Sequence, residues 1–327
     1  MSKTYSYVAA AMAASLLLSA CGAAAPTAAP AAATAKPAEA SGPKKGGKVT
    51  MGVWQSPATL NGLLGTQTVM NDVLAFDTEG LTNVQGDGTR IPALAREVPT
   101  VQNGGVSADG KTITYKLVEG VKFHDGTTFG CEDLQATLKA IMTPGVGIVS
   151  TTGYSDIDTI DCGTPNTAIV KFKNFYAPYL TLFGGLELIP KSAGDPAKMK
   201  DWSFNTKPIG TGPFKVVEFK ADEFVRLARN ADYRIKDQPY LDEVIIRIVP
   251  SSEVARQLLA SGEIDVMWNN TEADLPEIEK LPGVKMSKPL QIGGERMFLN
   301  LAENKDPSDP KKPHPILGDL KVRQAIA

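Results

Sequence analysis

Histidine and cysteine are scarce in this sequence, and charge of neither sign is in excess. Its 327 residues include 2 His and 3 Cys, and 34 Lys and Arg against 36 Asp and Glu give a formal net charge of −2. Without a basic surplus the chain offers no surface suited to nucleic acid. The two histidines, His124 and His314, lie far apart in the sequence, and no nucleophile or set of metal ligands accompanies either. We therefore expect no metal, no cofactor and no catalytic centre.

Long apolar runs are also scarce, and the clearest one lies at the N-terminus. Residues 8–18 form an apolar stretch of about a dozen residues, too short to cross roughly 30 Å of hydrocarbon as a helix and typical of a signal peptide. The stretch ends in "LSACG" (residues 18–22), which resembles the lipobox of bacterial lipoproteins. We expect residues 1–20 to be a lipoprotein signal peptide and Cys21 to be lipidated. An ordinary signal peptide with a chance cysteine is the alternative.

The next segment, residues 21–47, is rich in Ala and Pro and almost free of large apolar residues. Such a composition cannot bury a core, so it predicts a tether. About 280 residues remain, enough for one large domain or two ordinary ones. After Cys21 no stretch approaches the length of a transmembrane helix, so the lipid would be the only attachment to the membrane.

Two cysteines remain in a chain whose signal directs it to an oxidising compartment. We predict a disulfide between Cys131 and Cys162. A free thiol at Cys131 is the alternative, because this residue lies where a helix is expected to start, and a helix N-terminus lowers the pKa of a thiol.

Alternating and turn-rich segments predict the strands of the N-terminal half. Residues 46–55 and 111–123 read as strands, the second with Ile113 and Tyr115 on its buried face. A turn is expected at 103–110, before the second strand, and a hairpin at 155–174 around Gly163 to Asn166. Residues 177–186 have the pattern of a helix.

"HDG" (residues 124–126) places a His beside an Asp, a combination found in catalytic sites, but Asp-Gly is also ordinary turn chemistry. A helix follows over 132–142, with Leu134, Leu138 and Ile141 on one face. We interpret His124 as structural. The segment 207–219, "KPIGTGPFKVVEF", predicts a glycine-proline turn and a strand; it lacks the pattern of a phosphate-binding loop.

Residues 242–269 give the clearest βαβ pattern. The first strand reads as buried on both faces, Ser251 or Ser252 can cap the helix, Val254 is expected on its inner face with two leucines, and Gly262 suits its end. A second helix is expected over 275–281, with Asp274 and Glu277 as a capping box and Gly283 as the stop. Two further strands are predicted in "VKMSKP" (284–289) and "GGERMFLNLA" (293–302).

Several of these stretches together resemble the family 5 extracellular solute-binding proteins of ABC importers, which include oligopeptide-, dipeptide- and nickel-binding proteins. The matching stretches are "YKLVEGVKFHDGTTF…EDL", "KPIGTGPFKV", "NADYRIKDQPYLDEVIIRIVP", "LLASGEIDV" and "MFLN" followed by "LKVRQAIA". They occur in the family's order and cover nearly all of residues 48–327. In this family the His-Asp-Gly stretch looks like a turn of the first lobe.

The resemblance implies an α/β protein with the two-lobed fold of periplasmic binding proteins and an extra inserted domain, here mainly lobe one. It implies a lobe-one core of residues 48–85 and 205–295, an inserted domain of 86–204, and a crossover strand with the start of lobe two in 296–327. Family members usually continue beyond the helix in which this sequence ends, so we expect residues 302–327 to pack poorly and residues 22–327 to bind solute weakly or not at all.

In function, the resemblance implies a monomeric, lipid-anchored extracytoplasmic receptor that binds a peptide-like solute and delivers it to an ABC permease, without being an enzyme. Alternatives are a receptor for an oligosaccharide or a metal chelate, a secreted hydrolase, and a structural surface lipoprotein. Position in the family pattern implies these contact residues: Trp54, Gln55, Ser56, Asn61, Met297, Phe298 and Asn300. One departure is Gly130-Cys131, where the family commonly has Thr-Ala, so the usual hydroxyl cap of the helix is missing.

Overall fold

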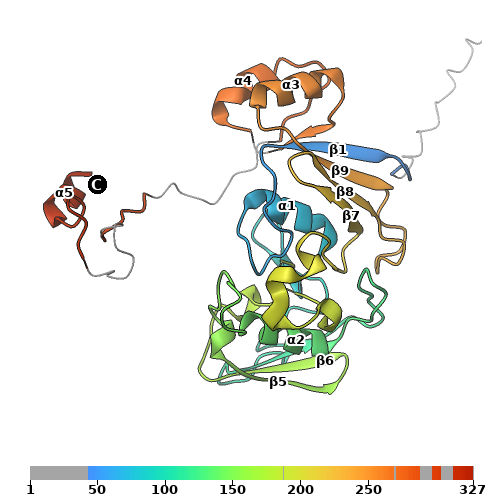
Figure 1. Ribbon diagram of the computed structural model, residues 1–327. Coiled ribbons are helices and arrows are strands. Elements are labelled where there is room, and N and C mark those ends of the chain that lie inside the picture. The colour runs from blue at the N-terminus through green and yellow to red at the C-terminus, as the bar shows by residue number, and fades with distance from the viewer. Residues whose placement is uncertain (1–42, 187, 269, 288–296, 303–311, 327) are drawn as a thin grey trace, which may run out of the picture. The chain divides into compact units, whose positions relative to one another are not determined.

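The computed structural model describes residues 43–186, 188–268, 270–287, 297–302 and 312–326. Cys21, the predicted signal peptide and nearly all of the predicted tether lie outside these residues. The described part of the chain is of mixed α/β type (Figure 1). None of its helices is both long enough and apolar enough to cross a membrane.

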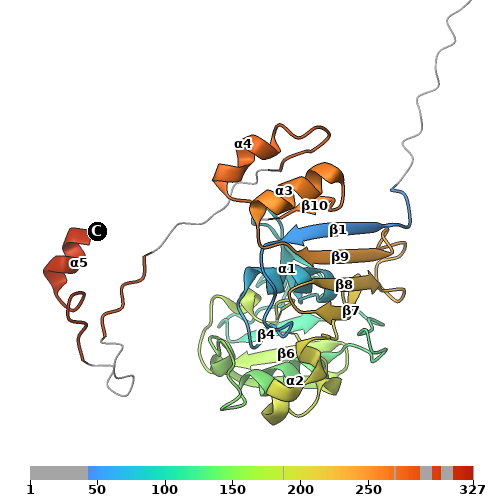
Figure 2. The same ribbon diagram turned by 45° about the horizontal axis from the view of Figure 1, so that its top comes forward.

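The first main sheet has five strands. They are β1 (Lys48–Val53), β7 (Phe214–Lys220), β8 (Phe224–Arg229), β9 (Glu243–Ile248) and β10 (Val266–Met267). Their order is β10-β1-β9-β8-β7, with β1 parallel to β9 and β10, and β8 antiparallel to β7 and β9 (Figures 1 and 2). The strands predicted within 46–55, 207–219 and 242–269 are therefore confirmed.

Helix α1 (Thr68–Asp77) packs against this sheet, in contact with β7 and β8. Its buried residues Val69, Met70, Val73 and Leu74 recur at helical spacing and form one apolar stripe. The buried strand residues in the same cluster are Met51, Val53, Phe214, Val216, Val225, Leu227, Val244, Ile246 and Ile248. Full burial of one such side chain is worth about 1.5–3 kcal/mol, so this cluster fixes the sheet as a rigid platform.

The predicted βαβ unit is present, with α3 (Ser252–Ser261) between β9 and β10. The Oγ atom of Ser251 accepts a hydrogen bond from the N–H of Val254 at 3.3 Å, and Gly262 ends the helix at a φ of 77°. Both are the predicted cap positions, and they fix where the chain enters and leaves the helix.

Two details of this unit were predicted wrongly. In β9 every second residue from Val244 is buried, but those between, such as Arg247, are only half-buried, because the sheet is mixed and one face receives α1. In α3 the buried residue is Ala255, whereas Val254 is 45% exposed. The apolar stripe of α3 is thus narrower than its sequence indicates, with Leu258 and Leu259 only partly buried.

The second main sheet is antiparallel and lies between α1 and β7 in sequence. Its strands are β4 (Thr112–Lys116), β5 (Ile157–Thr164) and β6 (Thr167–Phe172), in the order β4-β6-β5 (Figures 1 and 2). Ile113 and Tyr115 are buried as predicted, and the hairpin is tighter than predicted, because β5 extends to Thr164 and leaves only Pro165 and Asn166 as the turn.

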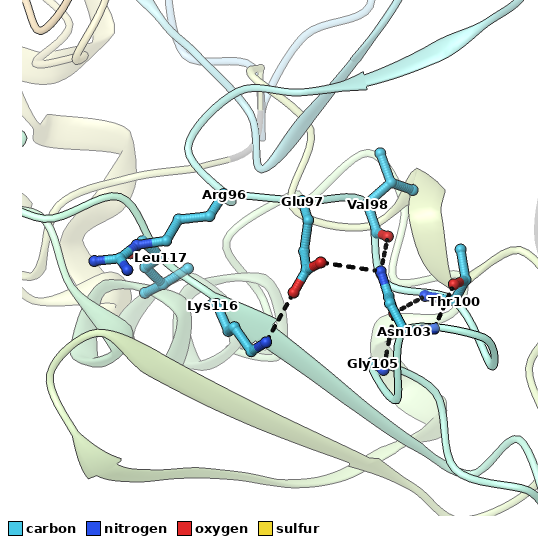
Figure 3. A network of polar contacts seen from close by, with 8 residues as sticks. All are labelled: Arg96, Glu97, Val98, Thr100, Asn103, Gly105, Lys116 and Leu117. Carbon is cyan, nitrogen blue, oxygen red and sulfur yellow. Dashed lines mark hydrogen bonds and ion pairs between the residues drawn. The ribbon is translucent and has the colours of Figure 1, made fainter.

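The turn before β4 is held by one asparagine (Figure 3). The Oδ1 atom of Asn103 accepts hydrogen bonds from the N–H groups of Thr100 and Gly105 at 2.9 and 3.0 Å. Its Nδ2 atom donates to the carbonyl of Val98 at 2.9 Å and to Glu97 at 3.3 Å. The other oxygen of Glu97 pairs with Lys116 of β4 at 2.9 Å, so the turn is tied to the strand that follows it.

Helix α2 (Cys131–Ile141) packs against β5 and β6, starting directly after Gly130. No side chain is available at Gly130 to cap it; instead Asp133 accepts a hydrogen bond from the N–H of Gly130 at 2.8 Å. A disulfide joins Cys131 to Cys162 of β5, with the two Cα atoms 5.5 Å apart, inside the range that a disulfide can bridge.

The other elements are short. They are β2 (Thr82–Val84), β3 (Arg90–Pro92), and the 3₁₀ helices η1 (Tyr154–Asp156), η2 (Tyr179–Thr181), η3 (Lys191–Ala193), η4 (Pro196–Asp201) and η5 (Ser203–Asn205). The helix predicted over 177–186 is wrong: only η2 forms there, and Phe183 has a φ of 54°, which interrupts any helix.

The C-terminal third contains η6 (Glu272–Asp274), α4 (Leu275–Ile278) and α5 (Leu320–Ile326). The capping box is one turn earlier than predicted: Asp274 accepts hydrogen bonds from the hydroxyl of Thr271 at 2.6 Å and its N–H at 3.3 Å. Residues 284–287 and 297–302, the described parts of the two predicted strands, form no strand, apart from an isolated antiparallel bridge between Ala302 and Pro313. In the terminal segment the apolar residues Ile316, Leu320 and Ile326 are 61%, 56% and 46% exposed.

Candidate functional site

The candidate site is a pocket of about 370 Å³ at the carboxyl ends of β1, β9 and β10. We call it the strand-end pocket. Its lining residues are Gly52, Val53, Trp54, Val249, Pro250, Ser252, Ala255, Met267, Trp268, Asn270, Thr271 and Asp274. Open α/β sheets bind ligands at the carboxyl ends of their parallel strands, because several chain segments turn away there and leave a crevice. We take this pocket as the candidate site because of its position and not because of its volume.

Backbone hydrogen bonds fix the two tryptophans of the pocket to the sheet. Trp54 follows β1, and the carbonyl of Val53 accepts a hydrogen bond from the N–H of Val249 at 2.7 Å. Trp268 follows β10, and its own N–H donates to the carbonyl of Gly52 at 3.1 Å. Trp54 is half-buried and Trp268 is 48% exposed, so both indole rings have free surface at the end of a rigid sheet.

The polar groups of the pocket come from the segment after β10. Asn270 donates from Nδ2 to the carbonyl of Met267 at 3.2 Å. Its Oδ1 atom is buried and has no hydrogen-bond partner among the described residues. The carboxylate of Asp274 accepts from Thr271, which lowers its pKa, and lies 3.8 Å from the guanidinium of Arg256. The carboxylate of Asp274 thus has protein partners, whereas the Oδ1 atom of Asn270 has none among the described residues.

A second carboxylate lies next to Trp268. The side chain of Asp72 on α1 lies against the side chain of Trp268, and burial raises the pKa of Asp72 above its usual value. Its Oδ2 atom is buried without a partner in the described part of the chain.

The predicted contact residues do not all meet at this pocket. Trp54 lines it, as the prediction of a cleft-facing loop requires. Gln55 and Ser56 are half-buried beside Trp54 but do not line the pocket, and the Oγ atom of Ser56 accepts a hydrogen bond from the N–H of Asp222 at 3.1 Å.

Asn61 is fully buried. Its Nδ2 atom donates to Asn205 at 2.9 Å, and its Oδ1 atom accepts from the N–H of Leu63 at 3.0 Å. Both ends of its amide therefore stabilise the fold, and we no longer place Asn61 among the contact residues.

Met297, Phe298 and Asn300 belong to the described segment 297–302 and are not among the pocket's lining residues. Met297 and Phe298 are 75% and 89% exposed. The residues that the sequence reading missed are Trp268, Asn270, Asp274 and Asp72. The first three follow the returning strand of the βαβ unit, so the rule that ligands bind at carboxyl strand ends could have found them.

His124 lies in a closed cluster away from this pocket. Its ring is 4% exposed; Nδ1 lies 3.4 Å from the fully buried Asp77, and Nε2 lies 3.1 Å from the carbonyl oxygen of Gly212. Gly210 packs so tightly here that an added Cβ atom would lie 2.0 Å from the carbonyl oxygen of Asp77. The "GTGP" segment therefore serves close packing against α1, and the interpretation of His124 as structural agrees with this geometry.

A neighbouring ion pair also has a structural role. The guanidinium of Arg234 donates to both oxygens of Glu79, at 2.7 Å for the shortest contact, and the hydroxyls of Tyr233 and Thr211 donate to the same carboxylate at 3.1 and 3.2 Å. Glu79 is thereby saturated with donors. In the described ranges no group of three or more His, Cys, Asp or Glu side chains is arranged to hold a metal ion.

Two other hollows lie elsewhere. One of about 490 Å³ is an open groove between α2 and β5, and one of about 380 Å³ lies among residues 62–71, 148–154 and 176–186. Neither lies at the carboxyl ends of the parallel strands, and neither contains a tryptophan.

Comparison with known proteins gives a consistent result. The family model for bacterial extracellular solute-binding proteins, family 5 Middle, matches residues 89–327. The oligopeptide-binding protein AppA of Bacillus subtilis is 26% identical over 292 residues, covering 87% of this chain and 50% of AppA. The chain spans about half the length of the curated relatives it matches.

Solved structures share the fold. AppA of Bacillus subtilis in complex with a nonapeptide aligns with a TM-score of 0.66 at 25% identity, covering 74% of this chain and 48% of AppA. AgaA from A. tumefacien R10 in complex with agropinic acid aligns with a TM-score of 0.63 at 28% identity, covering 72% and 46%. The ABC transporter substrate-binding protein CtaP of Listeria monocytogenes aligns with a TM-score of 0.63 at 26% identity, covering 73% and 47%. These neighbours have the two-lobed periplasmic-binding-protein fold predicted for this chain.

Proposed function

Because the chain belongs to the family 5 bacterial extracellular solute-binding proteins, we propose that it is the solute receptor of an ABC importer and delivers a peptide-like solute to the permease. The observation that supports this most is the strand-end pocket, where two tryptophans and the unsatisfied amide oxygen of Asn270 meet on a rigid sheet. Small-molecule sites typically combine apolar walls with a few fixed polar groups.

Within the proposed protein, residues 48–85 and 205–295 are the core of lobe one, 86–204 an inserted domain, and 296–327 the crossover with the start of lobe two. These boundaries are supported by the two sheets, since the five-stranded sheet uses strands from 48–53 and 214–267 and the three-stranded sheet uses strands from 112–172. The cleft closes when a solute contacts both lobes, so binding selects the closed form. No bond is made or broken.

A peptide-like solute is preferred over the alternatives because two flat aromatic surfaces suit the side chains and backbone of a peptide. AppA was solved with a nonapeptide, and AgaA with agropinic acid. An oligosaccharide or metal-chelate receptor therefore remains the alternative. For a metal chelate, the chelator and not protein carboxylates would hold the ion.

We further propose that Cys21 is lipidated and that residues 21–47 tether a monomeric receptor outside the cytoplasm. The "LSACG" stretch after a short apolar run supports this. A lipid keeps the receptor close to the permease, which raises its local concentration without a contact between the folded parts.

The proposed function is tested by isothermal titration of the exported chain with a pool of tri- to pentapeptides. The chain spans about half the length of its curated relatives, and we expect residues 22–327 to bind peptides weakly. Trp54→Ala should weaken binding, whereas Phe175→Ala, which removes an aromatic side chain 66% exposed outside the pocket, should not. No heat with peptides, and saturable heat with an oligosaccharide or chelate pool, would replace the peptide-like solute by the alternative.

A further inference from the structure

Two buried acceptor atoms in and next to the strand-end pocket have no hydrogen-bond partner among the described residues: one belongs to Asn270, a lining residue, and the other to Asp72, which lies against the lining residue Trp268. The orientation of the Asn270 amide is set because Nδ2 donates to the carbonyl of Met267, which leaves Oδ1 buried and without a partner among the described residues. The Oδ2 atom of Asp72 is in the same condition. A buried acceptor left without a donor costs about 1–3 kcal/mol, so such atoms mark positions where a guest donates.

The charge around the pocket is negative and only partly compensated. No Lys, Arg or His is among its lining residues. Arg256 lies 3.8 Å from Asp274 and offsets that carboxylate. Asp72 has no cation within ion-pair distance in the described part of the chain, and its side chain lies against Trp268. A negatively charged guest would therefore be repelled, and a positively charged one attracted.

The aromatic walls favour the same kind of guest. Trp is the side chain whose ring face attracts a cation most strongly, at about 0.5–1 kcal/mol when exposed and about 2 when desolvated. Trp54 and Trp268 both line the pocket. The contact between Asp72 and Trp268 places a carboxylate next to one of these rings, which makes the surroundings of that ring more negative still.

From these observations, and resting on the proposed function, we propose that the strand-end pocket binds a cationic group of the solute, an alkylammonium or guanidinium. Asn270 Oδ1 accepts one of its N–H bonds, the tryptophans face its charge, and Asp72 supplies the countercharge. The solute class is therefore a peptide that carries either a basic side chain or a free amino terminus at this position. Peptides with an acidic group there are excluded.

The test uses the indole N–H resonances of the exported chain in nuclear magnetic resonance spectra, which detect even weak binding. The chain has 3 Trp, so each indole signal can be assigned with single Trp→Phe variants. Trp202 is buried outside the pocket, and its indole donates to the carbonyl of Asp195 at 3.0 Å, so it serves as the internal control.

Four probes separate the sources of charge. They are Ac-Ala-Lys-Ala-NH₂, Ac-Ala-norleucine-Ala-NH₂, Ac-Ala-Glu-Ala-NH₂ and unacetylated Ala-norleucine-Ala-NH₂. If the lysine probe shifts the Trp54 and Trp268 signals and the unacetylated probe does not, the pocket binds the cationic group of a basic side chain. If the unacetylated probe shifts them and the lysine probe does not, the pocket binds the amino terminus. In both cases the Trp202 signal stays in place and the glutamate probe has no effect.

Asp72→Asn keeps the size and an acceptor oxygen of the side chain but removes its charge. We expect this variant to weaken binding of the cationic probe about tenfold and to leave binding of the norleucine probe unchanged. Glu253→Gln is the matched control, since Glu253 is an exposed acid in the first turn of α3 outside the pocket lining.

The neutral or the glutamate probe shifting both signals as strongly as the lysine probe would overturn the cationic pocket and leave the receptor function intact. If the wild type binds peptides by titration while no probe moves either pocket indole, the cationic pocket is again overturned. If no peptide of any charge binds in either measurement, the proposed function itself fails.

Discussion

Nδ1 of His124 lies 3.4 Å from Oδ2 of Asp77, and both side chains are shut off from solvent. Asp77 ends α1, which packs on the five-stranded sheet, and His124 lies in the turn between β4 and α2. The same carboxylate accepts a hydrogen bond from the N–H of Val216 in β7 at 3.0 Å. His124, which belongs to a motif that resembles a catalytic site in the sequence, thus makes a polar contact that connects the two sheets.

Replacing His124 by Ala should destabilise the fold by about 1–3 kcal/mol, because it removes a polar partner of the buried Asp77 carboxylate. Urea unfolding monitored by circular dichroism measures this difference. Lys122→Ala, which removes an exposed side chain of the same turn, should change stability little. If His124→Ala lowers the free energy of unfolding by less than about 1 kcal/mol, the contact between His124 and Asp77 does not hold the sheets together.

Asp72 gives a pH-dependent prediction. Burial raises its pKa in the folded chain above 3.8, so the folded state binds this proton more tightly than the unfolded state does. The stability contributed by the protonated group is complete below pH 3.8 and is lost as pH rises through the raised pKa. Asp72→Asn should therefore show a smaller loss of stability than the wild type over this rise. Parallel curves for the two proteins in thermal unfolding from pH 3.5 to 7 would contradict it.

The Cys131–Cys162 disulfide closes a loop with a sequence separation of 31 residues. By chain entropy such a crosslink stabilises the fold by about 3–4 kcal/mol. Peptide mapping of exported protein without reductant should find the two residues linked, and Cys131→Ser should unfold at lower urea concentration. Two free thiols in exported protein would leave the alternative of a reactive Cys131.

Cys21 provides the prediction for the segment outside the described residues. Cys21→Ala should move the protein from the membrane fraction to the soluble fraction, because lipid is the only anchor we propose. Membrane fractionation with an antibody against the folded part measures this. A variant that stays in the membrane and is processed like the wild type would contradict lipidation.

The sequence predicted best those elements whose signals are local. The strand at 46–55, the βαβ unit at 242–269 and the caps Ser251 and Gly262 follow from alternation and from the chemistry of single residues. The helix prediction for residues 177–186 was wrong because the apolar residues of this segment suit a helix, but Phe183 takes a positive φ that only the tertiary structure imposes. The prediction that Val254 is buried was wrong because helix propensity does not show how much of a helix face its neighbours cover.

The candidate site was less predictable for a different reason. Trp54 could be placed from its position after β1, but Asn61 could not, since its bond to Asn205 depends on a segment more than a hundred residues away. Asp72 could not be connected to Trp268 either, because nothing in the sequence shows which face of α1 meets the end of β10. Contacts between distant segments decide a binding site, and a single sequence carries no direct record of them.

The central claim, that this chain receives peptides without transforming them, is tested most directly by affinity selection. The exported chain, in its longest available form, is incubated with a defined pool of tri- to pentapeptides and separated from unbound peptide, and the bound fraction is released and identified by mass spectrometry. The account predicts intact peptides, enriched in those with a basic residue or free amino terminus and depleted by Trp54→Ala. Recovery of cleaved products, or of no peptide above the level found with heat-unfolded protein, would contradict it.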